Sequence, residues 1–328
     1  MIRRVLAGID IGGTKTAVVL SLRPPEILRR FVFDTNPADG PEPILARIRE
    51  SVYEGLSSQQ LKVTDLMGIG VCCGSPQDPT NGIIQEPPNL PSWKDVPIKS
   101  ILENEFGIEC FLDNDANAGA LAEHAFGAAQ GTQNMIFLTM GTGIGAGLIL
   151  NGKLYRGSSN LAGEIGHVRL TSSGPIGHNK SGTVEGWASG AGMARMAKSA
   201  IDAAVLTGEH SVLVAIDKRK GHSLSARDIW EAAQSGDILA SGIVSATGEK
   251  LGEALAILID LFNPECIVIG GLVLRMGEAL LGPARAVVAK EALSCAADVC
   301  KIVPAALGEQ VGDVAALCVA LEGLRLAK

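Results

Sequence analysis

The chain has 328 residues, of which 47% are hydrophobic and 19% are charged, an ordinary globular mixture with ample material for a core. Lys and Arg number 28 against 35 Asp and Glu, and the net charge of −7 argues against non-specific binding to nucleic acid or to an acidic membrane surface. No apolar run is long enough to span a bilayer, and the short N-terminal one leads straight into Asp10 and glycines, so we expect a cytoplasmic protein.

Short apolar segments alternate with segments of helical periodicity along the chain. Strands are predicted on either side of a glycine turn within Val5–Leu20, and then at Ile27–Phe33, Met67–Val71, Glu109–Leu112, Asn134–Met140, Glu265–Gly271 and Lys301–Leu307. Helices are predicted at Pro43–Leu56, at Ile98–Phe106, in most of Ser189–Phe262 and at Val311–Leu326. This alternation is typical of an α/β fold with largely parallel sheets. Both halves begin with a strand, a glycine turn and a strand, which suggests related topologies.

Cysteine spacing gives no sign of a disulfide framework. The number of cysteines is odd, and none of them forms a C-x-x-C pair. Most lie in apolar segments, so we expect buried, reduced thiols. The seven are Cys72, Cys73, Cys110, Cys266, Cys295, Cys300 and Cys318.

The first glycine turn reads G-I-D-I-G-G-T-K-T. It is not a P-loop, because Thr14 separates Gly13 from Lys15 and a strand rather than a helix follows. The backbone N–H groups of Gly12, Gly13 and Thr14 can form a nest for a phosphate, with Asp10 near enough to bind Mg²⁺ directly or through water. A plain tight hairpin with glycines at positive φ is the alternative at this point.

The second glycine turn contains Gly141, Gly143 and Ala146, which match the letters of the dinucleotide pattern G-x-G-x-x-G/A. That pattern must open a helix, whereas here G-L-I-L-N-G continues as a strand, so a dinucleotide oxidoreductase is a poor interpretation. Two glycine hairpins that carry Thr14 and Thr142 fit better with one nucleotide polyphosphate bound from two lobes.

The segment F-L-D-N-D places Asp113, Asn114 and Asp115 where a predicted strand ends and a helix begins. Ligands of α/β sheets bind at that edge, and Asp115 can accept a proton from a substrate hydroxyl. Capping of the helix by Asn114 or Asp115 is the structural alternative, although a cap needs only one such residue.

Two further segments carry side chains that suit a sugar. Glu164 and His167 lie three residues apart in G-E-I-G-H, and Glu185 follows in T-V-E-G-W. Sugar hydroxyls both donate and accept hydrogen bonds, so carboxylates, which accept, and imidazoles, which can do either, are suited to bind them. Taken singly, each residue is more often a surface carboxylate or a core histidine. His178 lies in the same region, but its neighbours assign it no task.

Together these segments resemble the ROK family of sugar kinases and repressors, within the actin-like, hexokinase-like ATPase superfamily. The resemblance covers nearly the whole chain in order: D-I-G-G-T-K-T, G-I-G-V-C-C-G-S-P-Q-D-P-T-N-G with P-P-N-L-P-S-W, D-N-D-A-N-A-G-A-L-A-E, L-T-M-G-T-G-I-G-A-G-L-I-L-N-G, G-E-I-G-H with Glu185, and N-P-E-C-I-V-I-G-G. One such segment is unspecific, but six in sequence are very specific. The resemblance implies a two-lobed, actin-like (ribonuclease H-like) α/β fold with a cleft between the lobes. We place the smaller lobe at residues 1–116 plus 312–328 and the larger at 117–311.

The resemblance also implies ATP-dependent phosphorylation of a free hexose at its 6-hydroxyl, with Mg²⁺ supported by Asp10 and with Asp115 as the general base. As partners it implies the sugar, ATP and a second copy of the chain in a homodimer. For the ring hydroxyls it implies Asn114, Asp115, Glu164, His167, Glu185, Asn89 and Gly74. For the nucleotide it implies Asp10, Gly12, Gly13, Thr14, Lys15, Thr142, Gly143, Gly270 and Gly271.

One departure from the family pattern concerns a metal. Many ROK proteins bind a structural zinc through the G-x-G-H histidine and three cysteines in C-x-C-G-x-x-G-C. The corresponding stretch here, G-P-I-G-H-N-K-S-G-T-V-E, contains no cysteine, and Thr183 stands where the last one is expected. Zinc prefers four N or S ligands, and at most two imidazoles remain. We therefore predict no structural zinc, and a loop between His167 and Glu185 that is held by packing.

A second departure leaves the sugar open. V-C-C-G-S-P-Q-D has one residue more than the V-P-G-P-V-D that is common in the family near the sugar. Glucose is the favoured acceptor, and N-acetylmannosamine, N-acetylglucosamine, mannose, fructose and allose are alternatives. A ROK repressor would carry a helix-turn-helix before the phosphate motif, where we see no room. The intact D-N-D and both phosphate turns disfavour a catalytically dead sugar-binding protein.

Overall fold

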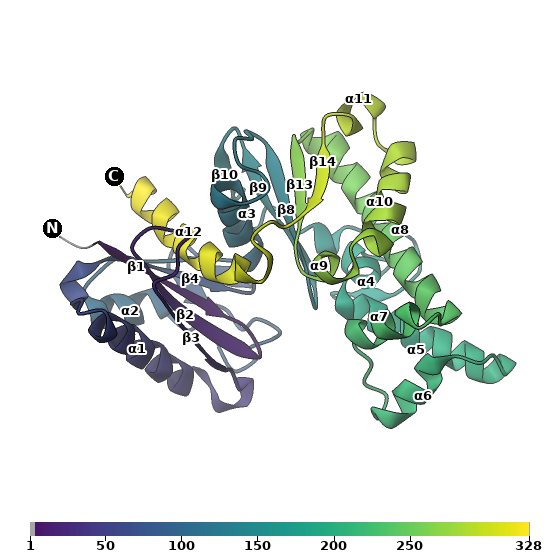
Figure 1. Ribbon diagram of the computed structural model, residues 1–328, viewed down its shortest axis with the longest axis horizontal. Coiled ribbons are helices and arrows are strands. Elements are labelled where there is room, and N and C mark those ends of the chain that lie inside the picture. The colour runs from purple at the N-terminus through teal and green to yellow at the C-terminus, as the bar shows by residue number, and fades with distance from the viewer. Residues whose placement is uncertain (1–3, 328) are drawn as a thin grey trace. The chain divides into compact units, whose positions relative to one another are not determined.

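The computed structural model describes residues 4–327. These residues form two compact units, and each unit is built on its own five-stranded sheet (Figure 1). The first unit consists of the described chain as far as Gln130, the segment Gly157–Asn160 and the chain from Leu307 onward, and the second unit consists of Gly131–Arg156 and Leu161–Ala306.

Helix α3 (Asp115–Phe126) explains why the first unit ends later than the sequence suggested. The predicted boundary after residue 116 would have cut this helix near its start, whereas the structure keeps it whole in the first unit. Its small apolar residues, such as Ala118 and Ala122, pack with Val314 and Cys318 of α12 (Val311–Leu326). The two helices therefore share one apolar contact and belong to the same unit.

The sheet of the first unit has the strand order β3-β2-β1-β4-β7. Strands β1, β2 and β3 form an antiparallel meander, and β4 and β7 continue the sheet parallel to β1. The strands are β1 (Val5–Ile11), β2 (Lys15–Ser21), β3 (Arg29–Asp34), β4 (Leu66–Cys73) and β7 (Cys110–Asp113), with the two-residue strands β5 (Gln77–Asp78) and β6 (Ile83–Ile84) in the long loop. The helices are α1 (Pro41–Ser58), α2 (Ile98–Phe106), α3 and α12, with the short helices η1 (Pro37–Asp39), η2 (Val63–Asp65) and η4 (Gly308–Gln310).

Both faces of this sheet are covered by helices, and the alternation of side chains in β1 shows how. Ile9 and its odd-numbered neighbours pack with residues of α1 and α2, whereas Leu6 packs on the other side with Leu317 of α12. On that side, a Cβ at Gly70 of β4 would lie only 1.9 Å from the carbonyl oxygen of Ala316. The glycine therefore allows α12 to lie directly on the strand.

The sheet of the second unit repeats this plan with the order β10-β9-β8-β13-β14. An antiparallel meander is again extended by two parallel strands, so the predicted relation between the two halves is confirmed. The strands are β8 (Met135–Met140), β9 (Ile144–Leu150), β10 (Lys153–Tyr155), β13 (Cys266–Ile269) and β14 (Lys301–Pro304), with a small hairpin of β11 (Ile176–Gly177) and β12 (Lys180–Ser181). The helices are η3 (Ile165–His167), α4 (Val184–Ala188), α5 (Gly190–Thr207), α6 (Val212–Arg219), α7 (Ala226–Gln234), α8 (Ile238–Phe262), α9 (Leu272–Met276), α10 (Glu278–Glu291) and α11 (Ser294–Ala297).

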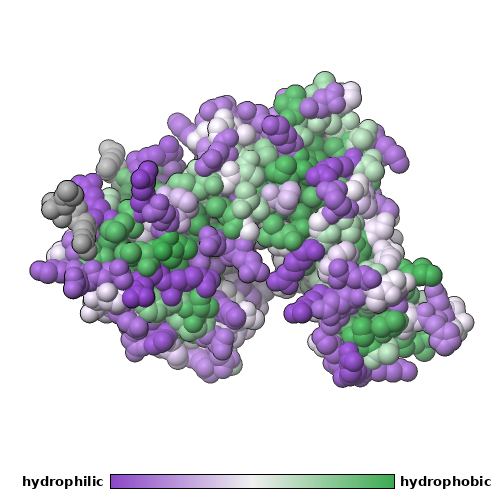
Figure 2. All heavy atoms as spheres, in the orientation of Figure 1, coloured by the Kyte–Doolittle hydropathy of each residue, from purple (hydrophilic) through white to green (hydrophobic). Residues whose placement is uncertain are grey.

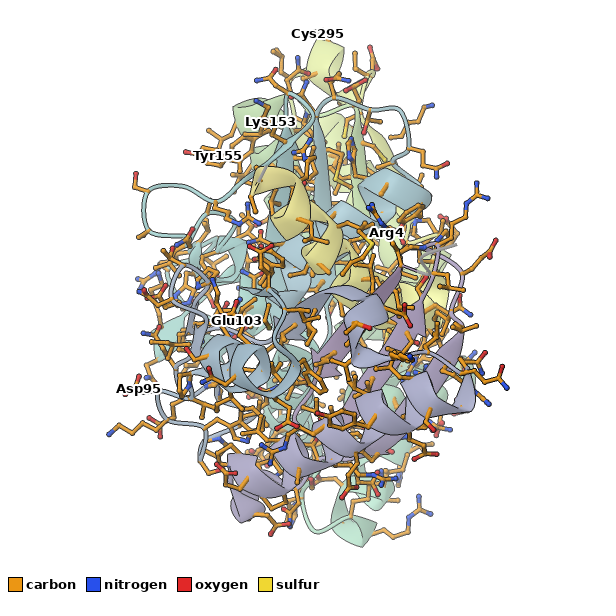
Figure 3. All side chains as sticks on the ribbon, turned by 90° about the vertical axis from the view of Figure 1, so that its left-hand side faces the viewer. Arg4, Asp95, Glu103, Lys153, Tyr155 and Cys295 are labelled. Atoms are coloured by element: carbon orange, nitrogen blue, oxygen red, sulfur yellow. The ribbon has the colours of Figure 1, made fainter. Side chains whose placement is uncertain are left out.

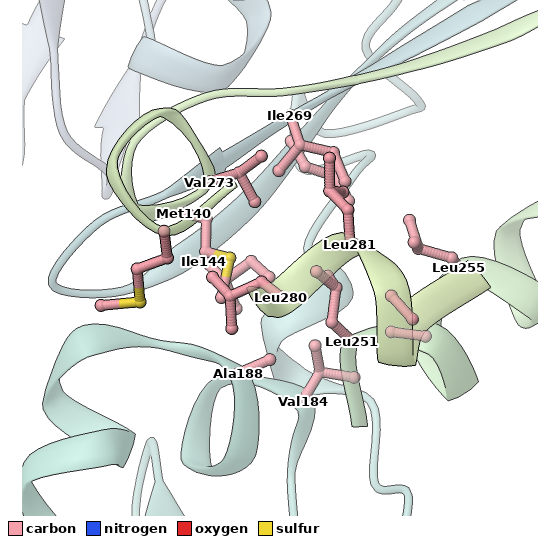
Figure 4. Close-up of a cluster of buried hydrophobic side chains, with 14 of the residues drawn as sticks. Met140, Ile144, Val184, Ala188, Leu251, Leu255, Ile269, Val273, Leu280 and Leu281 are labelled. Atoms are coloured by element: carbon pink, nitrogen blue, oxygen red, sulfur yellow. The ribbon is translucent and has the colours of Figure 1, made fainter. Parts of the chain in front are cut away.

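The core of the second unit reaches the second glycine turn (Figure 4). Met140 and Ile144, at the two ends of that turn, are buried in the same cluster as Leu251 of α8 and Leu280 of α10. A turn that is anchored at both ends in a packed core is held in a defined position.

The surface of the described residues is mixed in character. Figure 2 shows hydrophilic and hydrophobic residues interspersed over the visible face. All seven cysteines are free thiols, and six are buried as predicted, while Cys295 is exposed on α11 (Figure 3). Among residues 4–327 no single helix is long and apolar enough to cross a membrane, and only the bent pair of α5 and α6 passes by length and composition.

Candidate active site

The carboxyl ends of three parallel strands bring the acidic residues of the first unit together. In the sheet register, Asp10 of β1 pairs with Cys72 of β4, and Cys72 pairs with Asp113 of β7. Asp115 follows two residues later, at the first position of α3. Asp10 and Asp115 therefore lie at the same edge of the sheet, where ligands of α/β proteins bind, as the sequence predicted.

The three residues of the D-N-D segment differ in burial and in their hydrogen bonds. Asn114 caps α3, because its Oδ1 accepts a hydrogen bond of 2.7 Å from the backbone N–H of Asn117. Asp113 Oδ1 accepts from the N–H of Asn114 at 2.9 Å and from Nδ2 of Asn117 at 2.8 Å. Asp113 and Asn114 are buried, whereas Asp115 is exposed. The capping alternative is thus right for Asn114, and Asp115 is left as the carboxylate with access to a ligand.

Asp10 has an unusual environment for a carboxylate. Its pKa is raised to about 7, mainly because burial removes water from the carboxylate and also because Asp115 and Asp313 are nearby. Arg30, which forms an ion pair with Asp313, lowers the pKa of Asp10. Neither Asp313 nor Arg30 was singled out from the sequence, since no local motif marks them and only the packing of α12 on the sheet brings them close.

The acidic group around Asp10 has the features of one kind of magnesium site. Within residues 4–327 no three His, Cys, Asp or Glu side chains are arranged to hold a metal ion by themselves. Mg²⁺ usually takes one or two carboxylates and completes its shell with water and substrate phosphates. Asp10, crowded by like charges, fits that second pattern. The donor set is therefore compatible with a magnesium ion that arrives with a nucleotide.

The first glycine turn adjoins the long loop Gly74–Pro97. A Cβ at Gly13 would lie 2.7 Å from the carbonyl oxygen of Asn89, and a Cβ at Gly74 would lie 3.4 Å from Oδ1 of the same asparagine. The turn is a tight hairpin, closed between Gly12 and Lys15, but neither Gly12 nor Gly13 has a positive φ, so that expected reason for the glycines is wrong. Close approach of the backbone is what requires a glycine at position 13.

The second glycine turn is fixed by the start of α5. The N–H of Gly190 donates to the carbonyl of Gly141 at 2.8 Å, and the N–H of Ala191 donates to that of Thr142 at 3.2 Å. The side chain of Thr142 itself is exposed. The turn is therefore held by its carbonyl groups while the threonine faces solvent.

Gly271 brings the end of β13 against the same turn. It has a φ of +70°, and a Cβ there would lie 2.1 Å from the carbonyl oxygen of Met140. Both the backbone conformation and the space require a glycine. Gly270 beside it is buried against Phe137 of β8. The residues expected at the nucleotide in this unit, Thr142, Gly143, Gly270 and Gly271, thus form one local group.

The residues of the second unit that are expected at the sugar also lie near the second turn. A Cβ at Gly143 would lie 2.6 Å from Oε2 of Glu185. The other oxygen of Glu185, Oε1, lies 3.1 Å from Nε2 of His178, and the ring of His178 stacks on that of His167 with 3.7 Å between centroids. The pKa of His167 is lowered, chiefly by burial and then by His178, while Glu164 and Glu185 raise it. Sequence reasoning had left His178 without a task.

The segment between His167 and Glu185 is held by hydrogen bonds as well as by packing. Thr183, fully buried, caps α4 by accepting from the N–H of Gly186 at 3.1 Å. The backbone of Leu170 donates to the carbonyl of Gly182 at 2.9 Å, so the strand-like segments on either side of the hairpin are tied together. The prediction that packing holds this segment was therefore incomplete.

The same segment does not offer an arrangement suited to zinc. His167 and His178 are stacked 3.7 Å apart with an angle of 20° between their planes, so their in-plane lone pairs lie in separate, nearly parallel planes and do not converge on one point. The hydroxyl of Thr183 is engaged in capping and is not a typical zinc ligand. The absence of a structural zinc stays a prediction for measurement.

Every residue predicted to bind a ligand belongs to one of two local groups. Asp10, Gly12, Gly13, Thr14, Lys15, Gly74, Asn89, Asn114 and Asp115 lie in the first unit, and Thr142, Gly143, Glu164, His167, Glu185, Gly270 and Gly271 lie in the second.

Comparison with known proteins gives matches along nearly the whole chain. A model of the ROK family matches residues 6–322. A glucokinase of Halalkalibacterium halodurans is 35% identical over 313 residues, which cover 95% of this chain and 93% of that protein. The crystal structure of a ROK family glucokinase from Streptomyces griseus in complex with glucose and AMPPNP matches with a TM-score of 0.77 and 30% identity, over 97% of this chain and 100% of that one. A ROK family transcriptional regulator, a homologue of the E. coli MLC protein, matches with a TM-score of 0.84 and 26% identity, over 99% of this chain and 80% of its own. These matches confirm the predicted α/β fold.

Proposed function

Because this chain belongs to the ROK family and is a sugar kinase, we propose that it transfers the γ-phosphoryl group of ATP to the 6-hydroxyl of a free hexose, with glucose as the preferred acceptor. Support comes from the similarity to two glucokinases, one of which was crystallised with glucose and AMPPNP. N-acetylmannosamine, N-acetylglucosamine, mannose, fructose and allose are the acceptors against which glucose should be compared.

The observation that carries this proposal is the placement of Asp115. Its carboxylate is exposed at the first position of α3, beside Asp10 at the carboxyl edge of the sheet. There it accepts the proton of the 6-hydroxyl as the hydroxyl oxygen attacks phosphorus. Asp113 and Asn114 beneath it are buried and hydrogen-bonded, which fixes the start of the helix and hence the position of the base.

The glycine turns supply the phosphate contacts in this proposal. Backbone N–H groups at Gly13 and Thr14, and at Thr142 and Gly143, bind phosphate oxygens, because glycines leave the backbone accessible. The N–H of Gly12, expected in the same nest, instead donates to the carbonyl of Lys15 at 2.9 Å and closes the turn. Lys15 is exposed next to the first turn and adds a positive charge. When bound, Mg²⁺ would neutralise charge on the phosphates, and Asp10 is the residue that would hold it. Gly270 and Gly271 lie beside the adenosine.

Ring hydroxyls are bound by the remaining polar residues. In the second unit these are Glu164, His167 and Glu185, which are half-buried or exposed. In the first unit they are Asn89, the backbone at Gly74, and the amide group of Asn114. The Oδ1 of Asn114 caps α3, and its Nδ2 is a hydrogen-bond donor that can bind a sugar hydroxyl. Each unit thus carries polar groups of the kind that a hexose requires.

The same family resemblance supports two further proposals, a homodimer and a cytoplasmic location. The acidic net charge of −7 suits a protein that stays in solution rather than on an anionic membrane. Light scattering on the purified protein tests the dimer, and fractionation of cells that express it tests the location.

The decisive experiment replaces the base. Asp115→Asn keeps the shape of the side chain but cannot take up a proton, so ADP release with glucose should fall by about a thousandfold, within the usual range for a lost general base. Binding of glucose, measured by calorimetry, should survive. The matched control is Asp95→Asn, which changes an exposed carboxylate in the long loop (Figure 3). Normal turnover in Asp115→Asn would remove Asp115 from its role, and a wild type that phosphorylates none of the six sugars would refute the proposed function.

A further inference from the structure

The hairpin of β11 and β12 has an unusual residue at its tip. Ile176 pairs with Ser181 and Gly177 pairs with Lys180, which leaves a two-residue turn of His178 and Asn179. Both turn residues have positive φ, 49° and 58° respectively. Turns of this type favour asparagine and glycine, and histidine is one of the few other residues found at positive φ. The turn therefore accepts His178, and its side chain sets it apart.

The side chain of His178 contacts two of the residues expected at the sugar, Glu185 and His167. Its Nε2 lies 3.1 Å from Oε1 of Glu185, within hydrogen-bonding distance when Nε2 carries the proton. Its ring covers that of His167 at 3.7 Å. One histidine thus touches two residues that are 18 positions apart in the chain.

On its far side, the carboxylate of Glu185 meets the second glycine turn. Its Oε2 lies where a Cβ at Gly143 would come within 2.6 Å, so the turn limits movement in that direction. The Glu185 side chain is 17% exposed, against 36% for that of His178. The carboxylate is therefore confined between an imidazole and a backbone turn, while part of it stays accessible to a ligand.

We propose that His178 is a positioning residue of the sugar site, which holds the Glu185 carboxylate and the His167 ring in the orientation that binds ring hydroxyls. This inference rests on the proposed function of Glu185 and His167 as sugar ligands. A carboxylate that is already oriented loses less freedom when it binds a hydroxyl, so the interaction with His178 strengthens sugar binding. The nucleotide is bound by other groups, and its affinity should not depend on His178.

The test uses substitutions that the turn accepts. Asparagine and glycine both fit a positive φ, so His178→Asn and His178→Gly remove the imidazole without straining the backbone. The matched control is Asn179→Gly, at the next position of the same turn. For His178→Asn and His178→Gly the KM for glucose should rise about tenfold, as expected for the loss of one charge-assisted hydrogen bond. The KM for ATP and the Tm should stay close to those of the wild type.

A double-mutant cycle then asks whether His178 acts through Glu185. Glu185→Gln should raise the KM for glucose by itself, and adding His178→Asn should raise it little further, because the oriented carboxylate is already gone. An unchanged glucose KM in both single His178 variants, or an equal rise in the KM values for glucose and ATP with a lower Tm, would overturn the proposal while the enzyme remained a kinase. Strictly multiplicative effects in the cycle would also overturn it. A wild type inactive on every sugar would instead refute the proposed function itself.

Discussion

The two local groups of candidate residues differ in the side chains that surround their carboxylates. In the first unit Asp10 is crowded by Asp115 and Asp313, and its pKa is raised to about 7. In the second unit Glu185 faces an imidazole, His178, at 3.1 Å. A carboxylate that is surrounded by other carboxylates favours binding of a cation, which offsets their repulsion. A carboxylate that already has an imidazole as partner suits an uncharged ligand. This difference agrees with a metal ion beside Asp10 and a neutral sugar beside Glu185.

Matched glycine substitutions in the two turns test that comparison most strongly. Gly13→Ala would place a Cβ 2.7 Å from Asn89, and Gly143→Ala would place one 2.6 Å from Oε2 of Glu185. We expect the first to lower kcat/KM for ATP by about a hundredfold, since small displacements at a phosphoryl-transfer site cost that much. The second should also lower kcat/KM for ATP, because both turns are proposed to bind phosphates, and it should in addition raise the KM for glucose by displacing Glu185. Initial-rate measurements with each substrate varied test this. An unchanged KM for glucose in Gly143→Ala would contradict the role proposed for Glu185.

The charge balance of the first unit can be tested through stability. Folding raises the pKa of Asp10 from 3.8 to about 7, so the folded protein binds this proton more tightly than the unfolded chain. The stability linked to Asp10 is therefore fully present below about pH 4 and lost as the pH rises through 7. In urea titrations without nucleotide or metal, Asp10→Asn should be more stable than the wild type by about 2 kcal/mol at pH 8, roughly half of what the shift alone implies. The two proteins should converge near pH 4.

Asp95→Asn is the control for this titration, since Asp95 is exposed and lies outside the acidic group. A stability difference between Asp10→Asn and the wild type that is constant from pH 4 to pH 8 would contradict the proposed burial and crowding of Asp10.

The smallest expected effect concerns zinc in the second unit. Stacked His167 and His178 and the capping hydroxyl of Thr183 provide no tetrahedral set of N or S ligands. A strong zinc chelator should therefore leave the Tm unchanged, and elemental analysis of the purified protein should find far less than about one zinc per chain, the amount a structural site would hold. A stoichiometric amount of zinc, or a clear loss of stability with the chelator, would overturn this prediction.

The sequence was most informative where local rules decide the structure. Val311–Leu326 and Ile98–Phe106 were predicted to the residue, because apolar periodicity and flanking loop residues define both helices. The D-N-D segment was placed correctly at a strand end, since strand and helix patterns meet there. The glycine turns were recognised from their residues. The steric reason why position 13 requires a glycine was not, because the contact is with Asn89, which lies in a loop distant in sequence.

What the sequence could not predict depends on contacts between distant segments. The raised pKa of Asp10 needs Asp313, which α12 brings to the first sheet. The role of His178 needs the two-residue hairpin, and the letters I-G-H-N-K-S carry only a weak turn signal. His178, to which the sequence assigned no task, thus became a candidate at the sugar site only through its contacts with His167 and Glu185.

The position of α12 has a consequence for synthesis on the ribosome. Helix Val311–Leu326 covers one face of a sheet whose first strand, Val5–Ile11, is translated about three hundred residues earlier, the separation that the sequence positions give. Until that helix emerges, Gly70 and its neighbours expose a bare apolar surface, and the whole second unit is made in the interval. The second unit is therefore synthesised while the first unit still lacks its last helix. The uncovered apolar face is then a site at which a chaperone can bind.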